Sequence, residues 1–358
     1  MLLYITAEDV FGDAAPQRRG PRPLHSIPPT LSALYDLGMR HHLRPAALAW
    51  PADGALEAVP DWKLDRLVIR LALYCRENLG LEPGARAAVF GRLGWLWPAA
   101  DFATLGFGAT SVGIEHDVPD AALEAALREA DPRVIFATDA LSAGRLLELR
   151  ARGVLPRAAL VGAGADSSAG ELVSLPKLLD LAGTLDTAER AQAFRMVCRR
   201  VEPEAQALWH VGARGTSRMT HARSMERVAA RLRARPPAAG DVAYLQPPRA
   251  TLAARLALAA FVGDGLTQAT LGREDATSED VARLRPHGMR VAAGWLEAAC
   301  AGRGPRWPAR LDHRGARRRL QERLGDRLRW VETERPVDAA TAAALAAVGA
   351  TVVGEREA

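Results

Sequence analysis

Five small residues between positions 212 and 220 are the strongest candidates for ligand chemistry in this sequence. They are two glycines and three hydroxyl residues, namely Gly212, Gly215, Thr216, Ser217 and Thr220. Small residues let backbone N–H groups approach an anion, and hydroxyl groups add donors, so a loop of this kind can hold phosphate oxygens. A glycine–hydroxyl loop is not specific by itself, and this pattern alone does not identify a function.

Other residues capable of chemistry are interpreted as structural. The adjacent His41 and His42 should point to different faces of a helix, and His210 and His221 lack a carboxylate or cysteine at metal-ligand spacing. We therefore predict no metal site. No Gly-x-Ser-x-Gly elbow is present. The arginine-dense stretch Arg303–Arg329 has little aromatic interleaving, which favours a solvated helix face, with an anion or nucleic-acid patch as the alternative.

The composition is that of an ordinary globular protein. Of 358 residues, 49% are apolar and 25% are charged, which is enough for two domains or one large α/β domain. The net charge of +5 comes almost entirely from arginine, because Lys63 and Lys177 are the only lysines. Together with the many Ala, Gly and Pro residues, this indicates a GC-rich coding bias more than a selected basic surface.

Cysteine usage and the absence of long apolar stretches bear on the cellular compartment. Cys75, Cys198 and Cys300 are far apart and odd in number, which argues against a disulfide framework. We see neither an uncharged apolar stretch of about 18 residues nor a basic segment preceding an apolar one at the N-terminus. The expected location is cytoplasmic.

Short apolar runs alternate with amphipathic stretches, which predicts parallel sheets covered by helices. The clearest predicted strands are 85–90, 110–114, 134–137, 158–161, 205–211, 241–245 and 266–271. The clearest predicted helices are 96–106, 119–130, 140–152, 222–235, 250–262, 278–284 and 294–300. We expect a loose arm at 1–30, a first α/β subdomain at 31–200 and a second, truncated one at 201–358, with boundary signals at Gly162–Gly170 and Gly302–Pro308.

The segment Trp62–Phe136 resembles the N-terminal subdomain of AMP-forming acyl-CoA synthetases, especially long-chain fatty-acid ligases. The residues that carry the resemblance are a Gly-Leu-x-Pro-Gly turn at Gly80–Gly84, a helix with Trp95 and Trp97, and a later strand that opens with Gly108-Ala109. Both tryptophans are predicted to lie in the core. The resemblance implies a large α/β domain with stacked, mostly parallel sheets, flanked by helices.

The family resemblance implies that residues 212–220 are a vestigial phosphate loop. The family has a Ser/Thr/Gly-rich loop with a Pro-Lys-Gly element, followed by a Thr-His pair that opens a helix. Thr220 and His221 match that pair, but the loop is shorter here and lacks the lysine. Arg214 or Arg218 are candidates to replace part of the charge, although arginine is bulkier and forked. ATP or AMP with Mg²⁺ would be the cofactor only if this loop still binds.

Later family motifs are also altered. The "Leu-Pro-Leu-x-His" turn reads Gln246–Ala250 and has no histidine. Where the family has a Ser-Gly-Gly-Ala-Pro-Leu turn at the acyl and adenine site, this chain has Val331–Val337, with carboxylates that would obstruct a ligand. The family's later ribose-binding aspartate, hinge and mobile C-terminal domain have no counterpart in this sequence.

Three functions remain open from the sequence. The first is a degenerate, catalytically inactive AMP-binding domain that binds an acyl or nucleotide ligand or serves as a partner subunit. The second is a working AMP-forming acid–thiol ligase, either with altered substrate use or completed by a separate chain that supplies the C-terminal domain. In that case Thr216, Ser217 and Thr220 would contact phosphate. The third is an arginine-rich binder of anions or nucleic acid.

Overall fold

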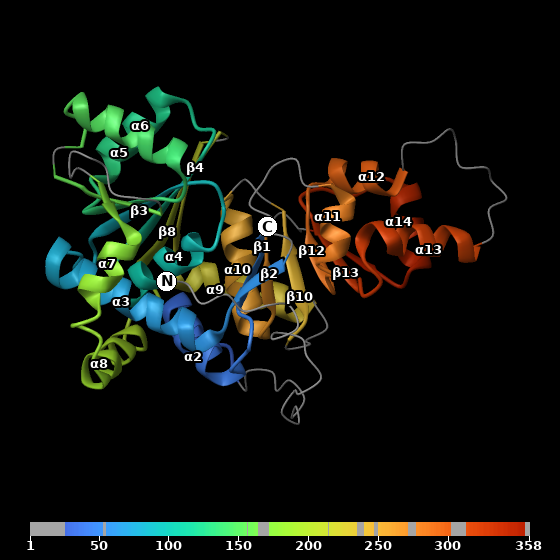
Figure 1. The fold of residues 1–358 in the computed structure, drawn as a ribbon, viewed down its shortest axis with the longest axis horizontal. Coiled ribbons are helices and arrows are strands. Elements are labelled where there is room, and N and C mark those ends of the chain that lie inside the picture. The colour runs from blue at the N-terminus through green and yellow to red at the C-terminus, as the bar shows by residue number, and fades with distance from the viewer. Residues whose placement is uncertain are drawn as a thin grey trace.

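The computed structural model describes residues 26–52, 55–155, 157–163, 172–213, 215–234, 240–246, 250–270, 277–301 and 313–354. Within them the chain builds two seven-stranded sheets. Figure 1 shows one sheet in the left half of the molecule and the other to the right of centre, with helices between them and on their far sides. The predicted α/β class, with stacked and mostly parallel sheets, is confirmed.

The first sheet contains the strands from the middle of the chain. Its order is β7-β6-β5-β3-β4-β8-β9, and every neighbouring pair is parallel except β8 and β9. The strands are β3 (Arg86–Gly91), β4 (Thr110–Glu115), β5 (Val134–Ala137), β6 (Ala159–Gly162), β7 (Leu172–Ser174), β8 (Gln206–Gly212) and β9 (Gly215–Thr220).

The second sheet combines an early hairpin with the later strands. Its order is β14-β13-β12-β10-β11-β1-β2, and only the β1–β2 pair is antiparallel. The strands are β1 (Leu48–Ala52), β2 (Ala55–Val59), β10 (Val242–Leu245), β11 (Thr267–Ala269), β12 (Gly288–Arg290), β13 (Trp330–Thr333) and β14 (Thr351–Gly354).

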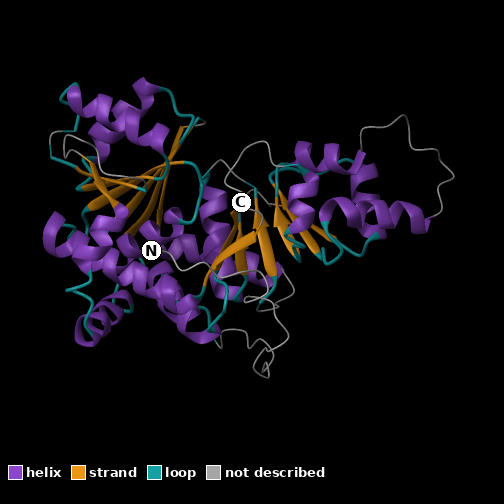
Figure 2. Ribbon diagram, in the orientation of Figure 1, coloured by secondary structure: helices purple, strands orange, loops and turns teal. Residues whose placement is uncertain are grey.

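Helices form three layers around the two sheets, as the colouring in Figure 2 makes clear. The far face of the first sheet packs against α5 (Asp120–Ala130) and α6 (Ala140–Ala151). The far face of the second packs against α11 (Ser278–Arg283), α12 (Ala293–Ala301), α13 (His313–Leu324) and α14 (Ala339–Ala347). The central layer comprises α2 (Leu31–His42), α3 (Asp61–Leu79), α4 (Leu96–Gly106), α7 (Leu175–Ala182), α8 (Ala188–Cys198), α9 (His221–Ala234) and α10 (Leu252–Asp264).

Strand β3 shows why the sequence folds in this way. Ala87 and Val89 pack into the central cluster, whereas Ala88 and Phe90 pack into the cluster under α5 and α6. Because a parallel strand covered on both faces must be apolar on both, its sequence is a continuous apolar run and does not alternate. Helix α4 is buried along its whole length for the same reason, with Trp97 fully enclosed.

The predicted elements correspond closely to the observed ones, with small corrections at helix starts. Helix α4 and strand β5 have the predicted bounds. The helix predicted at 119–130 begins one residue later, because Pro119 is the N-cap of α5. The helix predicted at 278–284 begins at Ser278, and Thr277 caps it through a reciprocal capping box with Asp280.

The sheets do not divide the chain at residue 200. Strands β1 and β2 join the later strands, and β8 and β9 join the earlier ones. The division into subdomains at 31–200 and 201–358 therefore stays a prediction about folding units. Most of the expected arm at 1–30 lies outside the described residues, as does most of both boundary signals.

Two further observations concern the described residues. All three cysteines are buried as free thiols, and burial raises the pKa of the Cys75 thiol to about 12. No helix in the described ranges is long and apolar enough to cross a membrane.

Candidate functional site

The segment predicted to be a phosphate loop is a β-hairpin. Strand β9 pairs with β8 up to Gly212 opposite Gly215, so the paired strands leave only positions 213 and 214 between them. Arg214, a candidate for replacing the family's lysine, lies outside the described residues. The expectation of a loop was wrong because the shortened segment allows the two strands to pair almost to their ends.

The hydroxyl residues of the hairpin do not converge on one point. Thr216 lies opposite Val211 and Ser217 lies opposite His210, so their side chains project from opposite faces of the sheet. Thr220 ends β9, and its hydroxyl accepts a hydrogen bond from Arg223 N–H at 3.2 Å in the first turn of α9. Three of the residues assigned to phosphate contact are thus separated, and their role in binding stays a prediction.

Arg218 is directed away from the expected site. Its guanidinium lies 3.9 Å from the centre of the Trp209 ring and forms an ion pair with Glu129 on α5. Trp209 belongs to the cluster on the far face of the first sheet. Arg218 therefore does not supply the charge that the family's lysine would bring to a phosphate.

A buried acid–imidazole pair lies beside the hairpin where the carboxyl ends of β4 and β8 meet. Glu115 Oε1 is 3.0 Å from His210 Nε2, and the two side chains are 7% and 9% exposed. A Cβ built on Gly212 would lie 2.6 Å from Glu115 Oε1 and 2.9 Å from His210 Nε2. The glycine is therefore required by this pair, and the carboxylate lies where a phosphate loop would need positive charge.

Sequence reasoning missed this pair because Glu115 and His210 are far apart in the chain and match no spacing rule. Their signal was an acid at the end of one apolar strand and a histidine within another. His221, the other histidine of this region, accepts a hydrogen bond from Leu31 N–H at 3.2 Å. Burial lowers the pKa of His221 to about 4, so its ring is neutral near pH 7. Among the described residues, no group of three or more potential metal ligands occurs.

A second polar cluster joins the first sheet to α10. Arg255 donates to Asp101 Oδ1 at 2.8 Å and Oδ2 at 3.1 Å, to Ser111 Oγ at 2.8 Å and to the Trp209 carbonyl at 3.3 Å. A Cβ on Gly113 would lie 2.6 Å from Arg255 Nη1. The cluster fills the space behind β4 with satisfied polar groups.

The segment Val331–Val337, which replaces the family's turn and begins within β13, is occupied by its own side chains. Glu332 is 2% exposed and accepts hydrogen bonds from Arg231 at 3.0 Å and from Arg290 at 2.5 Å. Glu334 accepts from Ala293 N–H at the start of α12 at 3.0 Å. The carboxylates that we expected to obstruct a ligand thus have structural partners. The neighbouring turn at Gln246–Ala250 lies partly outside the described residues.

Comparisons with known proteins agree with this fold. A family model described as AMP-binding enzyme matches residues 63–247. No curated protein matches the sequence. Among solved structures, the luciferase-like enzyme from the nonluminescent mealworm Zophobas morio is 12% identical, with a TM-score of 0.70, covering 93% of this chain and 74% of that one.

Two further solved structures extend the comparison. The N-terminal domain of FACL13 from Mycobacterium tuberculosis is 16% identical, with a TM-score of 0.63, and 91% of this chain aligns with 75% of it. The A domain of the carboxylic acid reductase from Segniliparus rugosus, solved with AMP and a co-purified carboxylic acid, is 15% identical, with a TM-score of 0.66. There, 91% of this chain aligns with 59% of the longer one.

Proposed function

The chain belongs to the AMP-binding enzyme family, and from this premise we propose that it keeps the adenylate-forming fold without the adenylation reaction. In this proposal the domain acts as a partner subunit, or binds an acyl or nucleotide ligand without turnover. The observation that carries it is the β8–β9 hairpin, which stands where the family has its phosphate loop.

The hairpin removes what an anion site requires from the backbone. Phosphate oxygens are held by several N–H groups that point into one concave loop. In the hairpin, β8 lies between β4 and β9 and pairs with both, so its backbone groups are engaged by neighbouring strands. Strand β9 is the edge of the sheet, and its outward N–H groups are spread along an extended strand and do not converge in a concave loop. The separated hydroxyls of Thr216 and Ser217 add no common anchor.

The charges around the hairpin also disfavour phosphate binding. Adenylation needs cations and donors positioned around a pentavalent phosphate. Here the carboxylate of Glu115 lies against Gly212, Arg218 is held on Trp209, and the sequence contains no lysine after Lys177. Phosphate and carboxylate repel each other, so this edge of the sheet disfavours ATP.

The test is ATP–pyrophosphate exchange by the purified chain with a panel of aliphatic and aromatic carboxylic acids, beside calorimetric titration with ATP–Mg²⁺ and AMP. We expect no exchange above the protein-free rate. Exchange with any acid would overturn the proposal and would favour the ligase alternative. A variant carrying a longer Gly/Ser/Thr loop with a lysine in place of residues 213–218 serves as the comparison, because nucleotide binding by that variant alone would assign the loss to the hairpin.

A further inference from the structure

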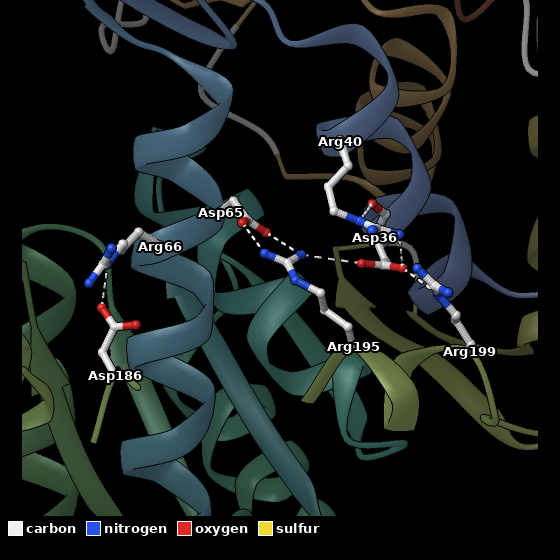
Figure 3. A network of polar contacts seen from close by, with 7 residues as sticks. All are labelled: Asp36, Arg40, Asp65, Arg66, Asp186, Arg195 and Arg199. Atoms are coloured by element: carbon white, nitrogen blue, oxygen red, sulfur yellow. Dashed lines mark hydrogen bonds and ion pairs between the residues drawn. The ribbon is translucent and has the colours of Figure 1, made fainter. Parts of the chain in front are cut away.

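Two buried aspartates in the central helical layer each share one carboxylate oxygen between two arginines. Asp36 Oδ2, on α2, accepts from Arg40 Nη2 at 2.9 Å and from Arg199 Nε at 2.8 Å. Figure 3 shows both guanidinium groups approaching Asp36, while Arg195 connects Asp36 to Asp65 on α3. Three arginines thus meet two carboxylates at this position.

The same arrangement recurs on the other side of α3. Asp186 Oδ2 accepts from Arg66 Nε at 2.6 Å and from Arg70 Nε at 2.8 Å. Figure 3 shows Arg66 and Asp65, which are neighbours in the chain, pointing to opposite sides of this helix. Each cluster therefore carries one more positive charge than negative charge.

The acids are inside and the arginines are outside. The side chains of Asp36 and Asp186 are 2% and 5% exposed, whereas those of Arg66 and Arg199 are 58% and 47% exposed. Arg66, Arg70 and Arg199 use only Nε in these contacts, and their terminal nitrogens donate no hydrogen bond within the described part of the chain. Two guanidinium groups on one oxygen repel each other, and a second anion bound to their outer nitrogens would relieve that repulsion.

Exposed apolar side chains accompany these arginines. Trp62 is 63% exposed and lies one helical turn before Arg66 on α3. Met196 is 44% exposed and precedes Arg199 by three residues. Leu43, at the C-cap of α2, is 73% exposed. Trp, Met and Arg are the residues that protein interfaces favour.

We propose that this surface docks an acidic segment of a partner protein. We name it the paired-arginine surface, and define it by Leu43, Trp62, Met196 and the arginines Arg40, Arg66, Arg70 and Arg199. The two clusters flank α3, and the chain neighbours of Leu43 and Trp62 join them, because Arg44 N–H donates to Asp61 Oδ2 at 2.6 Å. Carboxylates of the partner would accept paired N–H groups from the outer nitrogens, a geometry that arginine matches well. Apolar side chains of the partner would cover Trp62 and Leu43. The inference rests on the proposed partner-subunit function and names the chemistry of the partner.

A protein fits this surface better than a nucleic acid. Binding of single-stranded nucleic acid without sequence preference uses aromatic side chains on which successive bases stack. Here Trp62 is the only aromatic member of the set, and Lys63 Nζ already lies 5.4 Å from its ring centre. Aliphatic Leu43 and Met196 offer no stacking surface but suit an amphipathic helix.

The experiment uses the full chain and a fluorescein-labelled synthetic peptide in which glutamate pairs flank a Leu-Phe core. Binding is followed by fluorescence anisotropy at low and moderate salt, without nucleotide. We expect saturable binding that weakens as salt rises, and a loss of about tenfold or more in Arg66→Gln/Arg199→Gln. This variant leaves Asp186 with Arg70, and Asp36 with Arg40 and Arg195, so the buried acids keep partners.

The matched control removes two exposed arginines elsewhere, as Arg285→Gln/Arg318→Gln. Both form ion pairs, with Asp326 and Glu322, and their side chains are 53% and 83% exposed. The control has the same net charge as the test variant, so equal weakening in both would overturn the proposal. Absence of peptide binding would overturn it too.

Two further measurements test the apolar contact and the nucleic-acid alternative. Trp62→Ala should weaken the peptide several-fold without touching any arginine, and unchanged affinity would contradict the predicted apolar contact. An oligonucleotide of equal charge that binds more tightly than the peptide, through Arg66 and Arg199, would reassign the surface to nucleic acid. The result of the peptide assay does not change the result expected in the exchange assay. The proposed docking surface and the proposed loss of adenylation can therefore be refuted independently.

Discussion

Arginine meets aspartate in two different ways in this molecule. Between the sheets, the side chains of Arg255 and Asp101 are 1% and 4% exposed, and Arg255 donates from all three of its nitrogens. On the paired-arginine surface, Arg66 and Arg199 donate from one nitrogen each and lie about half in solvent. The residue types are the same, but the number of satisfied donors differs.

This difference distinguishes arginines that only stabilise the fold from arginines that can still bind a ligand. A buried guanidinium must have its donors satisfied, because each unpaired polar group there costs free energy. A half-exposed guanidinium is solvated and can exchange water for a ligand at little cost. Counting which nitrogens are engaged therefore indicates where this arginine-rich chain can still bind something.

Removing the buried arginine should have the largest effect. Arg255→Met leaves Asp101 as an uncompensated buried carboxylate, and we expect a loss of about 3 to 5 kcal/mol in the free energy of unfolding, measured with denaturant. Asp101→Leu/Arg255→Met removes both charges and should recover much of that loss. If the single variant were as stable as the wild type, the buried pair would not stabilise the joint between the sheets.

Acid should also act on the buried region more than on the surface. The pKa of His221 falls from 6.5 to about 4 because the ring is buried, so between these values the unfolded state takes up the proton first. The contribution of the neutral His221 ring to the free energy of unfolding is therefore fully present above pH 6.5. About 3 kcal/mol of it is lost as the pH drops toward 4. A protonated ring also cannot accept the hydrogen bond from Leu31 N–H.

Denaturant curves across this pH range, for wild type and His221→Asn, check the contribution. Asparagine keeps an acceptor but does not titrate, so the variant should lose less stability on acidification. His42 remains as a second acid-sensitive group in both proteins, since burial lowers its pKa to about 4. If the free energy of unfolding fell equally with pH in the two proteins, His221 would not contribute to the acid sensitivity.

A methyl group behind β4 should have a smaller effect. In Gly113→Ala the new Cβ would lie 2.6 Å from Arg255 Nη1 and 3.2 Å from the Trp97 ring. Because Arg255 is held by hydrogen bonds to Asp101, Ser111 and Trp209, we expect a cost of about 1 to 3 kcal/mol from overpacking. In the Arg255→Met background the cost should shrink, since the clashing group is gone. Equal costs in both backgrounds would show that Arg255 is not the obstacle.

The sequence predicted most of the fold because local signals agreed with the final structure. The apolar run at 134–137 and the helix at 96–106 are buried on all sides, so their patterns had only one stable solution. The sheet to which each strand belongs was not predicted, because β1 and β2 join strands about 200 residues later and no local pattern encodes that pairing.

The candidate site was harder to predict than the fold. Gly215–Ser217 were read as a loop from composition, yet pairing with β8 decided their conformation. Glu115 and His210 meet only because β4 and β8 are neighbours in the sheet. The arginine pairs on Asp36 and Asp186 depend on helices that come together in three dimensions, and each arginine alone resembles a solvated charge.

The smallest change in stability is expected on the paired-arginine surface itself. In Arg66→Gln/Arg199→Gln each ion pair removed should cost at most about 1 kcal/mol, because the two arginines are about half exposed and the buried acids keep other partners. The same variant should lose most of its affinity for the acidic peptide. Denaturation midpoints and anisotropy on one preparation compare the two quantities directly. A large loss of stability would instead make these arginines structural, like Arg255, and the distinction between the two regions would fail.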